Sequence, residues 1–199
     1  MNAIDLLIQD HKPVKKLLEE LSTTTERAVK KRAELLHRIE QELQIHTTLE
    51  EEILYPAIKQ AGGKEEAKMY YESKEEHRTV DALILPDLLH TETGTVEFAG
   101  RVKVMKELLE HHIEEEEGEL FPTAKKLLGK DTLEELGQTM EMQKKMLKGE
   151  QRAASSEQLS QAITCQRSGR WQVISFRYPI IIRKVSWNIG LGYLNGLRC

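Results

Sequence analysis

Apolar side chains recur along the first 147 residues of the chain with the spacing of α-helices. Near the N-terminus the positions step by alternating threes and fours, through Ile4, Leu7, His11, Val14, Leu18 and Leu21. This spacing places them along one stripe of a helix that packs on its neighbours through a single face. A histidine stands among the aliphatic residues of this stripe, so the buried face is not purely apolar.

Three further segments show the same period between residues that break helices. Ser22 to Thr25 can end the first helix, Gly62-Gly63 interrupts the chain, and the segment around Gly94 is a loop. The pattern predicts helices over about 4–21, 29–59, 64–89 and 96–128. Four long helices with short connections predict an all-α fold, an up-down-up-down four-helix bundle.

Prolines lie inside the second and fourth predicted helices, at Pro56 and Pro122. A proline in a helix interior removes a backbone donor, and its ring clashes with the preceding turn. We therefore expect both helices to kink or restart at these points.

After the fourth helix, Gly129 is a stop, and Thr132 and Glu135 have the spacing of a capping box. This pattern predicts a short fifth helix. Beyond about Glu150 the composition changes, and Val173 to Ile182 is β-branched and aromatic, which is typical of a strand. We expect a bundle domain over 1–148 and a basic, poorly ordered extension outside the bundle over 149–199.

Six residues of types that bind metals recur at one offset. A shift of 66 residues carries His11, His46 and Glu50 onto His77, His112 and Glu116. The same shift carries Glu51 onto Glu117, and Leu54-Tyr55-Pro56 onto Leu120-Phe121-Pro122. A fixed period across such unlike residues indicates a duplicated helical hairpin. It predicts a metal site with approximate two-fold symmetry, to which each half supplies two histidines and one glutamate.

The spacing within each half supports this interpretation. In His46-x-x-x-Glu50 and His112-x-x-x-Glu116 the two side chains lie one turn apart on the same helix face. His11 occupies the buried stripe of another helix, and the repeat gives His77 the same position. Imidazole and carboxylate without thiolate suit iron, manganese or zinc. The second oxygen of each glutamate can bridge to a neighbouring ion.

A lone histidine on an apolar face is more often a core residue than a ligand. Here that alternative must explain four histidines and two glutamates on four helices, and several buried ionisable groups without compensation are costly. We expect the remaining histidines, His37, His90 and His111, to lie at the surface. For Asp81 two interpretations stay open, that it supports the metal site, for example by a hydrogen bond to a ligand histidine, or that it has no role there. Most other acids, Glu51 and Glu117 among them, are expected to face water.

Charge is divided unevenly along the chain. Residues 1–150 hold 22 basic and 32 acidic side chains, a balance of −10, whereas residues 151–199 hold seven basic and one acidic, a balance of +6. Because residues 1–150 are so acidic, they offer no basic surface to which a phosphate backbone could bind, and nucleic-acid binding is not expected. Both cysteines, Cys165 and Cys199, lie in the extension. Without a signal peptide or membrane span, a cytoplasmic location is expected.

With these residues in place, the chain resembles the hemerythrin-like (HHE cation-binding) domains over about residues 1–147. The resemblance rests on four elements, which are Asp10-His11-Lys12, His46-x-x-x-Glu50 with its Leu-Tyr-Pro56, Glu75-Glu76-His77, and His112-x-x-x-Glu116 with its Leu-Phe-Pro122. It implies a non-haem di-iron centre, two irons per chain, with carboxylate and oxo or hydroxo bridges. His11 and His46 would then bind one iron, and His77 and His112 the other.

The chain departs from oxygen-carrying hemerythrins at two positions. These carriers have a further histidine where this chain has Ser73, and typically an aspartate where it has Glu116. Four histidines rather than five would open a coordination position. This difference favours sensing or peroxide chemistry over reversible oxygen carriage.

We therefore predict a protein that binds or senses O2, peroxide or nitrogen oxides, or responds to iron or redox state. A di-iron oxidase or a peroxide-decomposing enzyme on the same site is a competing interpretation. Iron storage, or iron delivery for iron–sulfur repair, is another, and a metal-free interaction bundle is a third. The sequence names no protein partner.

Overall fold

The computed structural model of the protein describes residues 1–168. Within them the regular elements follow in the order α1 (Ala3–Ser22), α2 (Val29–Leu49), η1 (Glu50–Leu54), α3 (Tyr55–Ala61), α4 (Lys64–Thr79), η2 (Val80–Ile84), α5 (Leu85–His90), α6 (Val96–Glu115), η3 (Glu116–Leu120) and α7 (Phe121–Ser168). All are helical, and η1 to η3 are single π-helical turns. No helix among these residues is both long and apolar enough to cross a membrane.

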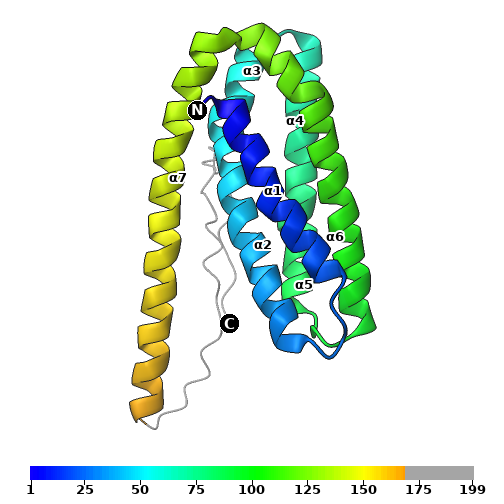
Figure 1. Cartoon of the computed structure of the whole chain (residues 1–199), viewed down its shortest axis with the longest axis vertical. Helices are drawn as coiled ribbons and strands as arrows, with labels where there is room; N and C mark the ends of the chain where they lie inside the picture. Colours follow the sequence, from blue (N-terminus) through cyan, green and yellow to red (C-terminus); the bar gives the residue numbers. More distant parts are fainter. Residues whose placement is uncertain (169–199) are drawn as a thin grey trace, which may run out of the picture. The chain divides into compact units, whose positions relative to one another are not determined.

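Four long helical rods lie side by side and form the predicted bundle (Figure 1). The first is α1, the second α2 with η1 and α3, the third α4 with η2 and α5, and the fourth α6 with η3. α1 packs on α2 and α6, and α4 packs on α3 and α6. Side-chain caps begin two of the rods at the expected places. Asn2 accepts a hydrogen bond from the N–H of Asp5 at 2.9 Å, and Thr95 accepts one from Phe98 at 3.2 Å. The predicted all-α fold is confirmed.

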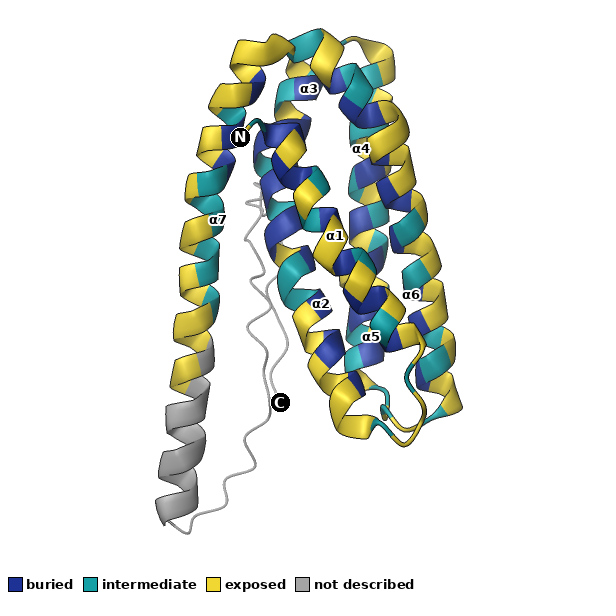
Figure 2. Cartoon of the chain, viewed as in Figure 1, coloured by how far each residue is buried: buried dark blue, intermediate teal, exposed yellow. Residues whose placement is uncertain are grey.

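Buried residues lie along the helices of the bundle (Figure 2), and the apolar ones form two clusters. One contains Leu7, Leu49 and Phe121, and the other contains Val14 and Leu43. On α1 the buried residue between Leu7 and Val14 is His11, and on α2 His46 lies between Leu43 and Leu49. The fold therefore holds a layer of buried polar side chains between two apolar clusters.

Each π-helical turn ends two residues before a proline, at Pro56, Pro86 and Pro122. In each case the residue before the proline donates to a carbonyl five residues back, as Tyr55 does to Glu50. The extra residue widens the turn against which the proline ring would otherwise clash. The kink or restart expected near Pro56 and Pro122 takes the form of these widened turns, and the sequence had not indicated the third such turn, before Pro86.

Two connections at one end of the bundle are tied together by Arg32, whose role the sequence did not indicate. Its side chain is buried, and it donates to the side chain and carbonyl of Thr24, both at 2.9 Å, and to the carbonyl of Thr93 at 2.7 Å. The guanidinium also lies over the ring of Phe98, 5.4 Å from its centroid.

The helix after Gly129 is longer than predicted. The chain kinks at Gly129, whose φ of 70° and ψ of 174° suit glycine, and the helix resumes before Thr132. It then continues to Ser168, because the segment is rich in helix-forming Lys, Glu, Gln and Ala and contains no proline. The predicted capping box is therefore inside the helix, and residues 149–168 are helical rather than irregular.

Contacts divide the chain into two units, Met1–Ser156 and Glu157–Cys199, whereas the sequence placed a boundary after residue 148. The first unit includes the α7 residues through Ser156. Leu133 and Met140 of α7 are buried in the same cluster as Ala3. The predicted strand over 173–182 lies outside the described residues.

Candidate metal centre

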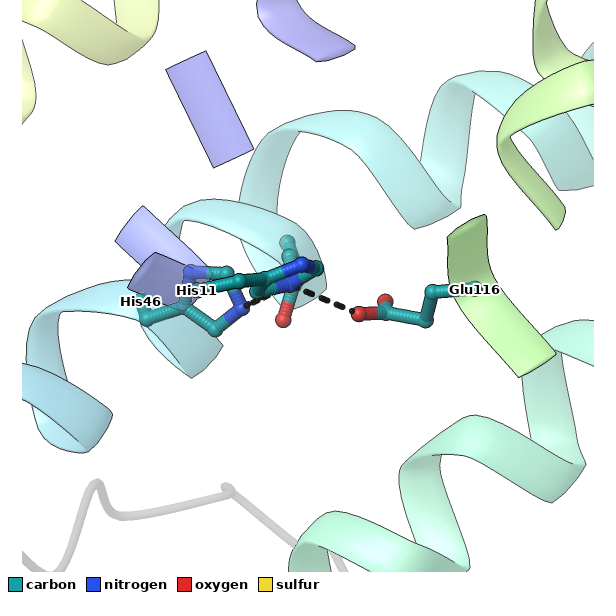
Figure 3. Close-up of side chains that lie close together, drawn as sticks. His11, His46 and Glu116 are labelled. Carbon is teal, nitrogen blue, oxygen red and sulfur yellow. Dashed lines mark hydrogen bonds and ion pairs between the residues drawn. The ribbon is translucent and has the colours of Figure 1, made fainter. Parts of the chain in front are cut away.

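The six residues related by the 66-residue repeat lie together in the middle of the bundle. Their relative exposures are between 0% and 5%, so all six are buried. They come from four rods, as His11 (α1), His46 (α2), Glu50 (η1), His77 (α4), His112 (α6) and Glu116 (η3). Figure 3 shows His11 beside His46 and facing Glu116. Their convergence was predicted; their role as ligands remains a prediction.

The histidines form two pairs, which match the two halves of the expected centre. The Nε2 atoms of His11 and His46 are 3.2 Å apart, and those of His77 and His112 are 3.0 Å apart. At a metal–nitrogen distance of about 2.1 Å, two ligands at right angles are about 3.0 Å apart. The spacing of each pair therefore fits two nitrogens on one ion.

The two glutamates lie between the pairs. Oε1 of Glu50 is 3.1 Å from Nε2 of His46, and its Oε2 is 3.5 Å from Nε2 of His77. Oε2 of Glu116 is 3.2 Å from His11 and 3.6 Å from His112. Each carboxylate thus faces both histidine pairs, which is the arrangement that a bridging carboxylate needs.

Three of the histidines point their outer nitrogen at a carboxylate. Nδ1 of His11 is 2.7 Å from Glu117, Nδ1 of His77 is 3.1 Å from Glu51, and Nδ1 of His112 is 2.7 Å from Glu76. A carboxylate only accepts, so these Nδ1 atoms carry the proton. Glu117 is exposed, as expected, and Glu51 is half-buried, but each also bonds a histidine of the layer, which the sequence did not indicate.

This tautomer shows that the site suits a cation. In a neutral ring with a proton on Nδ1, Nε2 presents a lone pair. Both His77 and His112 meet this condition, so two lone pairs would oppose each other across 3.0 Å. Neither oxygen of Glu50 accepts a hydrogen bond, nor does Oε2 of Glu116. A positive ion among these atoms would satisfy all of them at once.

Proton affinities in the layer reflect the same crowding. Burial raises the pKa of Glu50 well above its usual range, and the charge of Glu116 raises it further. Burial would also raise the pKa of Glu116, but His112, His11 and His46 outweigh it and hold that pKa below its ordinary value. Burial lowers the pKa of His46 well below its usual range.

One aromatic position breaks the symmetry of the repeat. Tyr55 donates its hydroxyl to Oε1 of Glu116 at 2.6 Å and stacks on His77. The repeat relates Tyr55 to Phe121, which stacks on His11 but has no hydroxyl to offer Glu50. Glu116 therefore has a fixed orientation that Glu50 lacks. Ser73, where carriers have a fifth histidine, is buried.

A pocket of about 320 Å³ lies against one half of the layer. It is lined by both His77 and His112, and its other lining residues include Leu43, Leu109 and Asp81. Asp81 is exposed, but the surrounding protein partly desolvates its carboxyl group and so raises its pKa. Small molecules can therefore come close to the His77–His112 pair from this side.

The remaining histidines are exposed and do not belong to the buried layer. His37 and His111 are 47% and 62% exposed, and each lies near a glutamate of its own helix. His90 is exposed and bonds the carbonyl of Pro86 near the end of α5. All three are at the surface, as the sequence predicted.

Comparison with known proteins agrees with this geometry. The family model of the hemerythrin HHE cation binding domain matches residues 2–124. The chain belongs to this family. As a hemerythrin HHE domain it is a metal-binding protein, and the resemblance seen in the motifs is confirmed.

A solved relative has the same fold. The crystal structure of a hemerythrin HHE cation binding domain-containing protein from Mycobacterium kansasii superposes with a TM-score of 0.66 and 28% identity, covering 75% of this chain and 89% of that one. A DNA nickase from Nostoc sp. is 26% identical over 135 residues. The match covers 68% of this chain but only 37% of the nickase.

Proposed function

We propose that this hemerythrin HHE domain holds two non-haem iron ions and binds or senses a small ligand such as O2, peroxide or a nitrogen oxide. One observation carries the proposal. Two histidine pairs, with Nε2 separations of 3.2 and 3.0 Å, lie on either side of two buried glutamates that face both pairs. Manganese and zinc also suit these donors, so the identity of the metal is part of the test.

In this proposal His11 and His46 hold one ion and His77 and His112 hold the other, while Glu50 and Glu116 lie between them. Iron bound there would supply redox chemistry and binding of a small ligand. The protein supplies a buried layer between two apolar clusters and fixed donors. Tyr55 fixes Glu116 through its hydroxyl, and Glu51, Glu76 and Glu117 fix three of the imidazoles.

The pocket beside His77 and His112 favours a small ligand. Its volume of about 320 Å³ is at the lower end of the range for ligand pockets. A di-iron oxidase or peroxide-decomposing enzyme would use the same approach to the same pair. Turnover of O2 or peroxide by the iron-loaded protein separates the two functions, since a binding or sensing protein takes up its ligand without sustained turnover.

The charge of the bundle argues against carrying over the activity named for the Nostoc relative. Residues 1–150 have a balance of −10, which repels a phosphate backbone. The chain also spans about a third of that relative's length. We therefore propose that the bundle does not act on DNA.

Metal analysis with an absorption spectrum, on protein purified with and without air, tests the proposal. We expect about two irons per chain and bands in the near ultraviolet from bridging oxygen ligands. Replacement of His112 or Glu116 by Ala should abolish the bands, whereas His37→Ala, at an exposed position, should keep them. Bands that survive both changes at the centre would contradict the ligand assignment.

A further inference from the structure

His46 differs from the other three histidines of the centre at its outer nitrogen. His11, His77 and His112 each have a carboxylate at Nδ1, but Nδ1 of His46 is buried and has no hydrogen-bond partner. A carboxylate at Nδ1 fixes the ring and raises the basicity of the nitrogen that binds metal. The His11–His46 pair therefore lacks one of the supports that the His77–His112 pair has.

The repeat identifies the residue that should occupy this position. Glu76 bonds Nδ1 of His112, and a shift of 66 residues relates Glu76 to Asp10 and His112 to His46. The carboxylate of Asp10 is instead paired with the ammonium group of Lys144, which lies on α7. The two side chains are 13% and 20% exposed, so the pair is largely removed from water.

Other contacts keep this part of α7 in place. Met140, one turn before Lys144, is fully buried against the N-terminal part of α1. Gln143 donates to Glu52 at 2.5 Å. Lys144 is thus held beside Asp10 by a docked helix that lies outside the four-helix repeat and has no counterpart in it.

We propose that Lys144 withholds Asp10 from His46, and so makes the ion position formed by His11 and His46 the weaker of the two. Lys144 and Asp10 are positioning residues in this proposal, because they act through His46 and touch no ion. It rests on the metal centre proposed above. It predicts that wild-type protein binds its two ions with unequal affinity, and that docking of α7 sets the difference.

Removal of the lysine charge tests this directly. In Lys144→Met, Asp10 loses its cation in a largely buried place, and the Nδ1–H of His46, the counterpart by the repeat of the one that Glu76 accepts, becomes available to it. Titration of metal-free protein with Zn²⁺ against a chromophoric chelator should show the weaker position tightened by roughly 10- to 100-fold. The stronger position should change little.

A second readout follows the imidazole itself. In zinc-loaded protein labelled with ¹⁵N-histidine, the Nδ1–H resonance of His46 should move downfield in Lys144→Met, as expected for a new hydrogen bond to a carboxylate. The double variant Lys144→Met with Asp10→Asn should lose both the gain in affinity and the shift, because an amide is a weaker acceptor than a carboxylate.

Lys148→Met is the matched control. Lys148 lies one turn later on α7 and pairs with Glu42 at 4.0 Å. Its replacement by Met therefore removes the same charge from the same helix and leaves the partner of Asp10 in place. We expect this variant to keep the wild-type affinities. A gain as large as that of Lys144→Met would show a general charge effect and overturn the proposal.

The outcomes separate this inference from the proposed centre. Wild-type protein that binds no ion contradicts both. Two ions of equal affinity, or unequal affinities that Lys144→Met leaves unchanged along with the His46 resonance, overturn the role of Lys144 and leave the centre standing. A Lys144→Met protein with lost helicity is replaced by Lys144→Gln, to which the same expectations apply.

Discussion

Glu50 is fully buried among histidines, and neither of its oxygens accepts a hydrogen bond. Burial and the nearby Glu116 raise its pKa, so the folded, metal-free protein holds a proton there more tightly than the unfolded chain does. At neutral pH this residue therefore opposes folding unless a cation is bound. The requirements of folding and of metal binding conflict at this position.

Replacement of Glu50 by Gln should stabilise the metal-free protein at neutral pH while it weakens metal binding. The sign follows from the raised pKa. The wild-type protein loses stability relative to the variant as pH rises above the ordinary glutamate value of about 4.3, by about 1.4 kcal/mol per pH unit, until the folded-state pKa is passed. Denaturant unfolding of both proteins between pH 4 and pH 8 measures the difference.

The exposed Glu114 provides the control, since Glu114→Gln should leave the stability unchanged at every pH. A stability difference for Glu50→Gln that does not grow with pH would show that this carboxyl is not protonated in the metal-free fold.

At the residue scale the sequence predicted the six inner positions, because two His-x-x-x-Glu motifs and their repeat are specific. It did not predict that Glu51 and Glu117 bond to histidines. Acids within runs of acids usually face water, and only the helix orientation brings these two against the rings. Glu51 and Glu117 do obey the 66-residue repeat, and that relation was the available indication.

At the scale of elements, Arg32 supplies hydrogen bonds to backbone carbonyls in two of the connections between helices. The loops near Thr24 and Thr93 expose carbonyls at the bundle end, and the buried guanidinium bonds one from each. Unpaired carbonyls in such a place would cost free energy. The sequence gives no hint of this role, since Arg32 reads as one basic residue in a charged segment.

Arg32→Met should therefore lower the free energy of unfolding by about 1–3 kcal/mol, since it leaves the half-buried carbonyls of Thr24 and Thr93 without this donor. Urea denaturation measures this loss. Arg38→Met, on the same helix at an exposed position, should change it by less than about 0.5 kcal/mol. The metal content should match wild type in both variants, and a loss of metal in Arg32→Met would show that the loops also shape the centre.

The π-helical turns show why the sequence could predict interruptions but not their form. Pro56 and Pro122 indicated that the helices are interrupted, yet a kink, a restart and a widened turn all relieve the same clash. Tyr55 and Phe121 follow two of these turns and stack on histidines of the centre, whereas Leu85 follows the third, so the same turn forms with and without an aromatic ring.

At the scale of the whole molecule, α7 is fastened to the start of the chain. A Cβ atom at Gly137 would lie 2.7 Å from the backbone carbon of Asn2 and 2.8 Å from the nitrogen of Ala3. Only a glycine allows this approach, and the positively charged amino group of Met1 lies 3.6 Å from Glu141 beside it. The sequence predicted a fifth helix with apolar positions, but not where it docks or how long it is.

Gly137→Ala should destabilise the protein by about 1–3 kcal/mol, because backbone atoms cannot move aside as a flexible side chain does. Gly149→Ala is the matched control on the same helix. Nothing lies within 4 Å of its added Cβ, so the higher helix propensity of Ala should leave stability equal or up to about 1 kcal/mol higher. Thermal unfolding of the two variants distinguishes a tight contact from a general effect of alanine.

The two helical hairpins also exchange equivalent contacts. His11 of the first hairpin bonds Glu117 of the second, and His77 of the second bonds Glu51 of the first. Each contact is the image of the other under the repeat, which is the rule of an isologous interface between identical subunits. One chain thus contains the interface of a homodimer, with one linker at Gly62-Gly63 in place of free ends. Fusion of two copies of an ancestral hairpin would produce this arrangement. Once the copies are fused in one chain, equivalent positions can differ, as Tyr55 and Phe121 do.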